Sequence, residues 1–268
     1  MSPKLTRVGE EEAGRRRLET GAAGLAAANG EPLAAATSQP LAAASGEPMA
    51  AACRASSLAT LAILFREPDA ELVDALSSGE LLGGLAPALA GREWDRGRVE
   101  IGLRRLALAA DEAQAGDPAA VLEDLSVEYA RLFTGPGLTM VPAHASEYLE
   151  PPTQSGRGLV GGDVAAAVEA TYRSFGVAVA GSADEPDFLP VELEFLYLLE
   201  RRVALSLATE DAAAADDWRA AAEQFTGGHM ALWMPQLARR LLDAHPCQLY
   251  AGAADLLAAA FGEAAPCA

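Results

Sequence analysis

The sequence is poor in the residues that most often carry metal or redox chemistry. It contains three histidines, His144, His229 and His245, and three cysteines, Cys53, Cys247 and Cys267. The histidines are scattered along the chain, and the cysteines are odd in number and show no CxxC spacing. We therefore expect neither a disulfide framework nor a metal site.

Motifs for nucleotide binding and nucleophilic catalysis are also missing. Neither G-x-x-x-x-G-K-[ST] nor G-x-G-x-x-G occurs, and in Gly135-Pro136-Gly137 the proline removes an amide that a phosphate site needs. The chain has no G-x-S-x-G and no H-E-x-x-H. No apolar run approaches the roughly 20 residues that cross a bilayer. The sequence therefore predicts no catalytic site, no cofactor-binding motif and no membrane span.

Positive charge is scarce and comes almost entirely from arginine, because Lys4 is the only lysine. The formal net charge is −18. Residues 1–52 hold five basic and six acidic residues, which leaves 15 basic and 32 acidic residues in 53–268. Such a body repels nucleic acid and anionic membranes and attracts basic partners. We expect a basic peptide as ligand, although acidity that only maintains solubility remains the alternative.

The first 52 residues differ in composition from the rest. The sequence EPLAAA at position 31 recurs as QPLAAA and EPMAAA at intervals of eight residues. This is low complexity, so we expect residues 1–52 to form a disordered tail before a folded domain over 53–268. Three arginines at 15–17 precede an alanine-rich stretch, but Glu19 and Glu31 interrupt it, which argues against an export signal.

Helical periodicity dominates from residue 55 onward. Aromatics make up only 6% of the chain, while alanine, the strongest helix former, supplies much of its apolar content. Apolar residues recur with a period of about 3.6 residues in several segments, and none alternates with period two. The expected helices are 55–65, 72–82, 98–114, 117–133, 163–175, 187–208, 216–225, 228–244 and 246–261. The prediction is an all-α, single helical-bundle domain of nine or ten helices, without strands.

Two acidic residues, Glu192 and Glu194, lie within the most apolar of these segments. They are two positions apart, hence about 200° around a helix, and cannot share one face. At least one must point into the apolar side or into a groove, where an unpaired carboxylate costs several kcal/mol. Two interpretations stay open: an internal arginine partner, or an acidic groove that receives arginines from a bound peptide.

Three motifs carry a resemblance to a known family. YARLFTGP at 129–136 is followed by P-x-x-x-S-x-Y at 142–148, EPDFLPVELEFL spans 185–196, and F-x-x-x-H-x-x-x-W spans 225–233. Together they resemble the TorD/DmsD/NarJ chaperones over about residues 57–262. The resemblance implies a TorD-like all-α fold.

The same resemblance implies a function. Relatives are cytoplasmic chaperones that bind the twin-arginine signal peptide or the apoprotein of a molybdopterin-containing oxidoreductase, and delay its export until the cofactor is inserted. It implies a non-enzymatic protein, as a monomer or a helix-swapped homodimer, with no cofactor of its own except, by resemblance, a guanine nucleotide. Two alternatives remain: an assembly factor acting on the mature part of a non-exported subunit, and a nucleotide-dependent enzyme.

The peptide-contact candidates follow from the motifs and from the acidic-groove interpretation. They are Tyr129, Phe133, Ser146, Tyr148, Pro186, Asp187, Phe188, Glu192 and Glu194. Tyr129 and Phe133 also fit the apolar stripe of their own helix, and Asp187 could merely cap the helix that follows. The family commonly has histidine where Phe188 stands and glycine where Pro190 stands, which puts the same mode of peptide recognition in doubt.

Overall fold

The folded chain is built almost entirely from helices. A computed structural model describes residues 25–27, 46–89, 94–135, 140–151, 160–179 and 185–262. The helices are α2 (Glu47–Leu64), α3 (Ala70–Ser77), α4 (Glu80–Leu89), α5 (Arg96–Ala115), α6 (Pro118–Tyr129), α7 (Ser146–Leu149), α8 (Gly162–Ser174), α9 (Leu189–Ala208), α10 (Ala212–Phe225), α11 (Ala231–Asp243) and α12 (Gln248–Phe261). Two π-helical turns, η2 (Ala130–Thr134) and η3 (Thr226–Met230), follow α6 and α10. The all-α prediction is confirmed.

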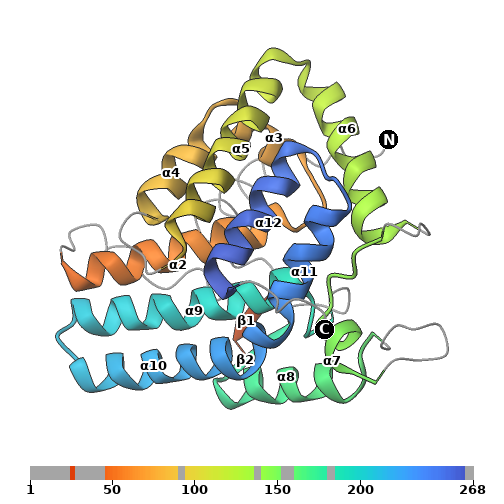
Figure 1. Cartoon of the computed structure of the whole chain (residues 1–268). Helices are drawn as coiled ribbons and strands as arrows, with labels where there is room; N and C mark the ends of the chain where they lie inside the picture. Colours follow the sequence, from red (N-terminus) through yellow and green to blue (C-terminus); the bar gives the residue numbers. More distant parts are fainter. Residues whose placement is uncertain are drawn as a thin grey trace, which may run out of the picture.

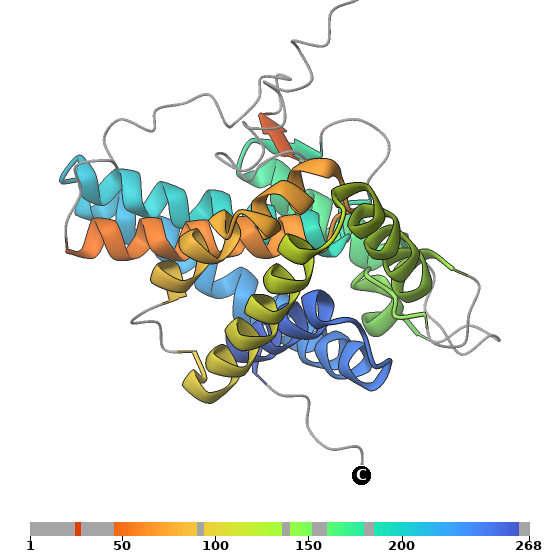
Figure 2. The same ribbon diagram turned by 90° about the horizontal axis from the view of Figure 1, so that it is seen from above.

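The helices form two groups that share one core. In the first group α2 lies along α9, and α10 lies along another side of α9 (Figure 1). In the second group α12 packs against α5 and α11, and the view from above shows this group crossing the first (Figure 2). The N-terminal half of α9, residues 189–199, is therefore enclosed by neighbours and buried throughout, which explains why this half is apolar on nearly every face.

Aspartates define the starts of four helices. The side chain of Asp69 accepts a hydrogen bond from Leu72 N at the start of α3. The same role falls to Asp95, Asp117 and Asp211 at the starts of α5, α6 and α10. Each carboxylate satisfies backbone amides that have no partner within the helix and stabilises it by roughly 1 kcal/mol.

Two predicted helix boundaries are wrong. The segment 72–82 is not one helix, because Gly79 adopts a φ of +76° and separates α3 from α4. The first long helix begins at Glu47 rather than near residue 55, since Pro48 is tolerated in a first turn and the last repeat unit is helical. The disorder predicted for residues 1–24 and 28–45 lies outside the described residues.

The prediction that no strands form also needs correction. Strand β1 (Leu25–Ala27) pairs antiparallel with β2 (Val177–Val179), with Ala26 opposite Ala178. Three residues are too few for period-two alternation to be visible in a sequence. The partners also lie about 150 residues apart, so the pairing depends on where α8 ends in the folded chain.

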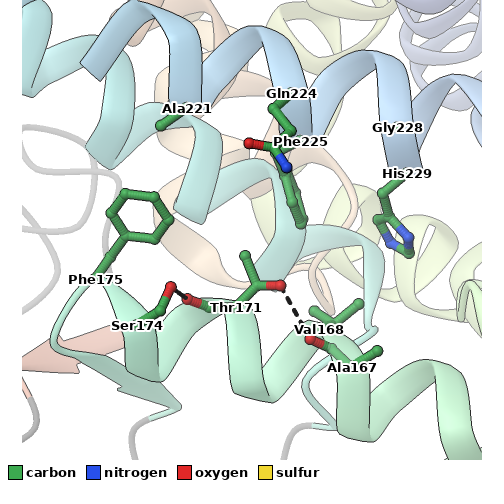
Figure 3. A pocket seen from close by; sticks show the side chains of 10 residues that line it. All are labelled: Ala167, Val168, Thr171, Ser174, Phe175, Ala221, Gln224, Phe225, Gly228 and His229. Atoms are coloured by element: carbon green, nitrogen blue, oxygen red, sulfur yellow. Dashed lines mark hydrogen bonds between the residues drawn. The ribbon is translucent and has the colours of Figure 1, made fainter. Parts of the chain in front are cut away.

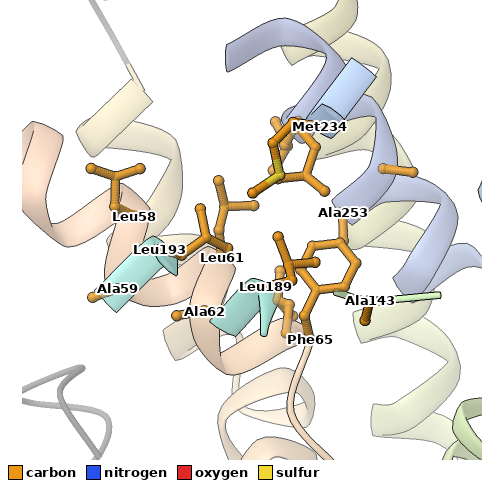
Figure 4. Close-up of a cluster of buried hydrophobic side chains, with 14 of the residues drawn as sticks. Leu58, Ala59, Leu61, Ala62, Phe65, Ala143, Leu189, Leu193, Met234 and Ala253 are labelled. Carbon is orange, nitrogen blue, oxygen red and sulfur yellow. The ribbon is translucent and has the colours of Figure 1, made fainter. Parts of the chain in front are cut away.

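The core gathers apolar side chains from both groups of helices. Leu61 of α2 and Phe65, the residue after that helix, meet Leu193 of α9, with Met234 of α11 and Ala253 of α12 beside them (Figure 4). All five side chains are fully or almost fully buried. Each large aliphatic or aromatic side chain of this kind contributes roughly 1.5–3 kcal/mol on burial.

Helices α5 and α12 cross unusually closely. A Cβ atom on Gly252 would lie 2.9 Å from Gly102 O and 2.9 Å from Leu106 Cγ. A Cβ on Gly102 would in turn meet Gly252 O at 3.0 Å. The two glycines thus allow backbone-to-backbone contact between helices, which fixes the position of α5 relative to α12.

Candidate functional site

The second part of the first motif and the start of the second motif meet in a short backbone crossing before α9. Ala145 N donates to Asp187 O at 3.0 Å, and Leu189 N donates to Ala143 O at 2.8 Å. Between them His144 forms an isolated antiparallel bridge with Phe188, and their rings stack with centroids 5.1 Å apart. The residue that replaces the family's usual histidine therefore lies against a histidine from the other motif.

Asp187 is fully buried at this crossing. Its Oδ2 accepts a hydrogen bond from Ser146 N at 2.9 Å, at the start of α7. The alternative that Asp187 caps α9 is wrong, because the residue before α9 is Phe188 and no side chain caps that helix. Asp187 Oδ1 and Ser146 Oγ are buried and have no hydrogen-bond partner among the described residues. The hydrogen bond from Ser146 N to Asp187 Oδ2 thus joins two of the predicted contacts.

Glu192 lies one turn into α9 and is also fully buried. A hydrogen bond of 2.7 Å joins its Oε1 to His229 Nε2, and Trp233 Nε1 donates to its Oε2 at 3.1 Å. Burial raises the pKa of Glu192 from 4.5 to about 7, opposed by the bonds to His229 and Trp233 and increased by the charge of Asp187. At neutral pH the carboxyl is therefore poised between its two protonation states.

Glu194 is buried as well, with 1% of its surface exposed. Its Oε1 accepts from Arg66 Nε at 3.1 Å and from Nη2 at 2.9 Å. The internal arginine partner that the sequence left open is thus present for Glu194, whereas Glu192 has a histidine and a tryptophan instead. Neither carboxylate reaches the surface, because α9 is enclosed by its neighbours.

Tyr129 and Phe133 form a separate aromatic cluster with Phe65 and Tyr250. The Phe133 ring lies 5.0 Å from Tyr129 and 5.5 Å from Tyr250. Both predicted contacts are buried, at 8% and 9% exposure. Burial raises the pKa of Tyr250 far above its usual range. The core role that the sequence allowed for Tyr129 and Phe133 is the one the structure shows.

The π-turn η2 positions Phe133. Gly135 N donates to Ala130 O at 2.6 Å and closes the turn, and a Cβ on Gly135 would lie 2.7 Å from the same oxygen. Val141 N donates to Leu132 O, which returns the chain from η2 to the crossing. The glycine of the first motif is therefore required by close backbone approach.

Tyr148 and Pro186 are half-buried. The Tyr148 hydroxyl donates to Pro142 O at 2.8 Å, and its ring lies 5.4 Å from Trp233 and beneath the Arg240 guanidinium. Pro186 O accepts from the Tyr172 hydroxyl at 2.9 Å. Tyr148 thereby connects the first motif, through Trp233, to Glu192.

A groove opens between α8 and α10 beside this network. It encloses a cavity of about 490 Å³ whose lining includes Phe175, Phe225 and His229. Phe225 and His229 point from α10 and η3 toward α8, where Thr171 and Val168 lie opposite (Figure 3). We call it the α8–α10 groove. Its walls mix apolar side chains with polar ones and contain no Asp, Glu, Lys or Arg, and His229 is the side chain that links it to buried Glu192.

The sequence did not identify the partners that complete this site. His229, Trp233, Arg66 and His144 each contact a predicted residue but were not assigned a role. The four-residue spacing of Phe225, His229 and Trp233 was the available signal for two of them, since such residues lie on one side of a helix. Nothing in the sequence pointed to Arg66.

The nine predicted contacts are thus divided between three places. Ser146, Tyr148, Asp187, Phe188 and Glu192 share the crossing and its network, and Pro186 adjoins it. Glu194 faces α2, and Tyr129 with Phe133 face α12. Among the described residues no three His, Cys, Asp or Glu side chains are grouped so that they could hold a metal ion. No helix in that part of the chain is long and apolar enough to cross a membrane.

Comparison with known families decides the membership. The family model described as nitrate reductase delta subunit matches residues 98–239, which is more than half of the chain. The chain belongs to this family. The nitrate reductase delta subunit family consists of molybdoenzyme assembly chaperones, and its match includes all three motifs. The resemblance to the TorD/DmsD/NarJ chaperones is thereby confirmed. A search of curated proteins finds no match.

Proposed function

We propose that this delta-subunit family member is a cytoplasmic, non-enzymatic chaperone for the catalytic subunit of a molybdopterin-containing oxidoreductase. It binds the twin-arginine leader of that subunit, its apoprotein, or both. Binding keeps the subunit from export while the cofactor is inserted. The chaperone itself needs no resident cofactor and works as a monomer or a helix-swapped homodimer.

The observation that carries this proposal is the charge of the folded body. Residues 53–268 contain 32 acidic and 15 basic residues. A twin-arginine leader joins a basic region to an apolar one, so an acidic protein attracts it over a distance and an apolar groove holds it. The same field repels the phosphates of nucleic acid and of nucleotides, which disfavours the nucleotide-dependent alternative.

The pair of buried Glu192 and partly exposed His229 does not favour an enzyme. His229 lines the α8–α10 groove, but no hydrogen bond joins a serine or cysteine to either member among the described residues. A nucleophile within hydrogen-bond reach of its base is the minimum for covalent catalysis. The pair instead holds η3 and α11 against α9, which is a structural role.

Calorimetric titration with leader peptides tests the proposal. The full chain is titrated with leaders of molybdoenzyme catalytic subunits from the same genome, with arginine-to-glutamine leaders as controls, at low and moderate salt. We expect micromolar or tighter binding that weakens with salt and with loss of the arginines. If no leader binds and the mature apoprotein does, the assembly-factor alternative replaces the proposal.

A further inference from the structure

A second groove lies on the other side of the molecule, between α5, α6 and the start of α12. It encloses a cavity of about 390 Å³. Leu76, Ala113, Leu125 and Leu249 form its floor and are buried. Its remaining lining includes four acidic residues and no basic one. We call it the α5–α6 groove.

The four acidic residues of the α5–α6 groove are not equivalent. Asp117 caps α6, and Glu128 accepts hydrogen bonds from Arg131 and from Cys247 N. Glu112 of α5 and Asp124 of α6 are exposed, and no hydrogen bond or ion pair to a described residue involves the carboxylate of either. Two free carboxylates therefore flank an apolar floor from opposite helices.

Apolar surface continues beyond the α5–α6 groove on both helices. Leu108 lies one turn before Glu112 and is 47% exposed, and Val127 lies one turn after Asp124 and is 65% exposed. Residues three or four apart are neighbours on a helix surface, so each of these apolar side chains is next to a free carboxylate, outside the groove lining. Val127 is the most exposed large apolar side chain in the described part of the chain. An apolar surface edged by unpaired charge is typical of a binding site rather than of a solvated face.

We propose that the α5–α6 groove binds a peptide segment in which arginines neighbour apolar residues. The proposal rests on the proposed function and locates its leader-binding site. Apolar side chains of the peptide lie on the floor near Leu125 and Leu249. The arginines of the peptide pair with Glu112 and Asp124, because free carboxylates accept the paired N–H groups of guanidinium. Charge complementarity selects this occupant over a neutral or acidic peptide.

The α5–α6 groove suits this role better than the crossing before α9. The carboxylates of Asp187, Glu192 and Glu194 are buried and would have to leave their surroundings to meet a ligand. Glu112 and Asp124 need no rearrangement, since both are already exposed. Rigid grooves bind with less ordering cost than sites that must first open.

Charge-neutral variants test the location. In the double variant Glu112→Gln with Asp124→Asn both free carboxylates lose their charge. The matched control, Asp111→Asn with Glu123→Gln, removes two exposed charges from neighbouring positions that do not line the groove. We expect about tenfold weaker leader binding in the groove variant, which is a loss of about 1.4 kcal/mol shared by two ion pairs, and less than twofold in the control.

The same variants are then titrated with the arginine-to-glutamine leader. If the arginines contact Glu112 and Asp124, the groove variant no longer weakens binding once the arginines are gone. A steric variant, Ala120→Trp, fills the groove from its exposed edge and is expected to weaken binding at least tenfold, whereas Ala119→Trp, one position outside the lining, is not.

The outcomes separate the two proposals. If the wild-type chain binds neither a leader nor the apoprotein, the proposed function fails; if it binds only the apoprotein, the assembly-factor alternative replaces the proposed function and the inference about the groove is overturned. If it binds a leader and the groove variants match their controls, the function stands and the location is wrong. Light scattering adds a further outcome: a dimer that dissociates in the groove variant, with leader affinity unchanged, would assign the groove to a second copy of the chain and overturn the inference.

Discussion

The N-terminal half of α9 and the α5–α6 groove both place carboxylates beside apolar side chains, but with opposite access to solvent. At α9, Glu192 and Glu194 are buried and hydrogen-bonded to partners within the chain. In the groove, Glu112 and Asp124 are exposed and free. A buried carboxylate needs a partner within the chain for the fold to be stable, whereas an exposed carboxylate remains accessible to a ligand. Glu192 and Glu194, in the apolar first half of α9, therefore stabilise the fold.

The largest expected effect comes from removing Glu192. In Glu192→Leu the buried Trp233 Nε1 loses its acceptor and His229 Nε2 loses its hydrogen-bond partner, so we expect the free energy of unfolding to fall by about 3 kcal/mol. The single variant Asp124→Asn, in the groove, should change the free energy of unfolding by less than about 0.5 kcal/mol. Urea unfolding followed by circular dichroism measures both. Similar losses for the two variants would remove the distinction between the regions.

The pH dependence of stability sharpens the same comparison. The folded-state pKa of Glu192 is about 7, above its ordinary value of 4.5, so the folded chain retains a proton there that the unfolded chain releases. The stabilisation from this proton is fully present below about 4.5 and is lost as the pH rises through 7. His229 and Asp187 face the same carboxyl and modulate the change.

Comparison of wild type with Glu192→Gln isolates this contribution. Relative to the glutamine variant, the wild-type chain should lose stability between pH 5 and pH 8 by an amount on the order of 2 kcal/mol. Unfolding measured across that range in both proteins gives the difference. Parallel curves would show that Glu192 does not retain its proton in the folded state.

The crossing of α5 and α12 links the groove to the core, and a smaller effect is expected there. Gly252→Ala forces a methyl group against Gly102 O and Leu106, so we expect a loss of about 1.5 kcal/mol. Gly84→Ala in α4 is the control, because nothing lies within 4 Å of its Cβ and alanine favours helix. The midpoint temperature of thermal unfolding should fall for Gly252→Ala and should not fall for Gly84→Ala.

Much of the helical architecture was predictable from local signals. The period of apolar residues located most helices, and Asp117 with Pro118 marked the start of α6 correctly. The break at Gly79 was missed because helical periodicity continues on both sides of it. The early start at Glu47 was missed because it lies in a repeat that was assigned to the low-complexity tail. The three-residue strands were missed because they are too short to show a pattern.

The candidate site was predictable only in part. The sequence indicated that Glu192 or Glu194 must turn inward, and left an arginine partner or a peptide groove open. It did not reveal that both are buried, because that depends on how many helices surround α9. The exposed pair of Glu112 and Asp124 carries no motif at all, so only their positions on adjacent helices relate them.

The sequence by itself determined the all-α class, the excess of negative charge and the family motifs, because helix propensity, capping and composition act within a few residues of the chain. Tertiary structure decided which carboxylates are buried, which partners they meet and where a groove remains. Arg66 reaches Glu194 across 128 positions, and His229 reaches Glu192 across 37. Such contacts arise when whole helices pack against one another, and a pattern within a few residues of the chain carries no information about that packing.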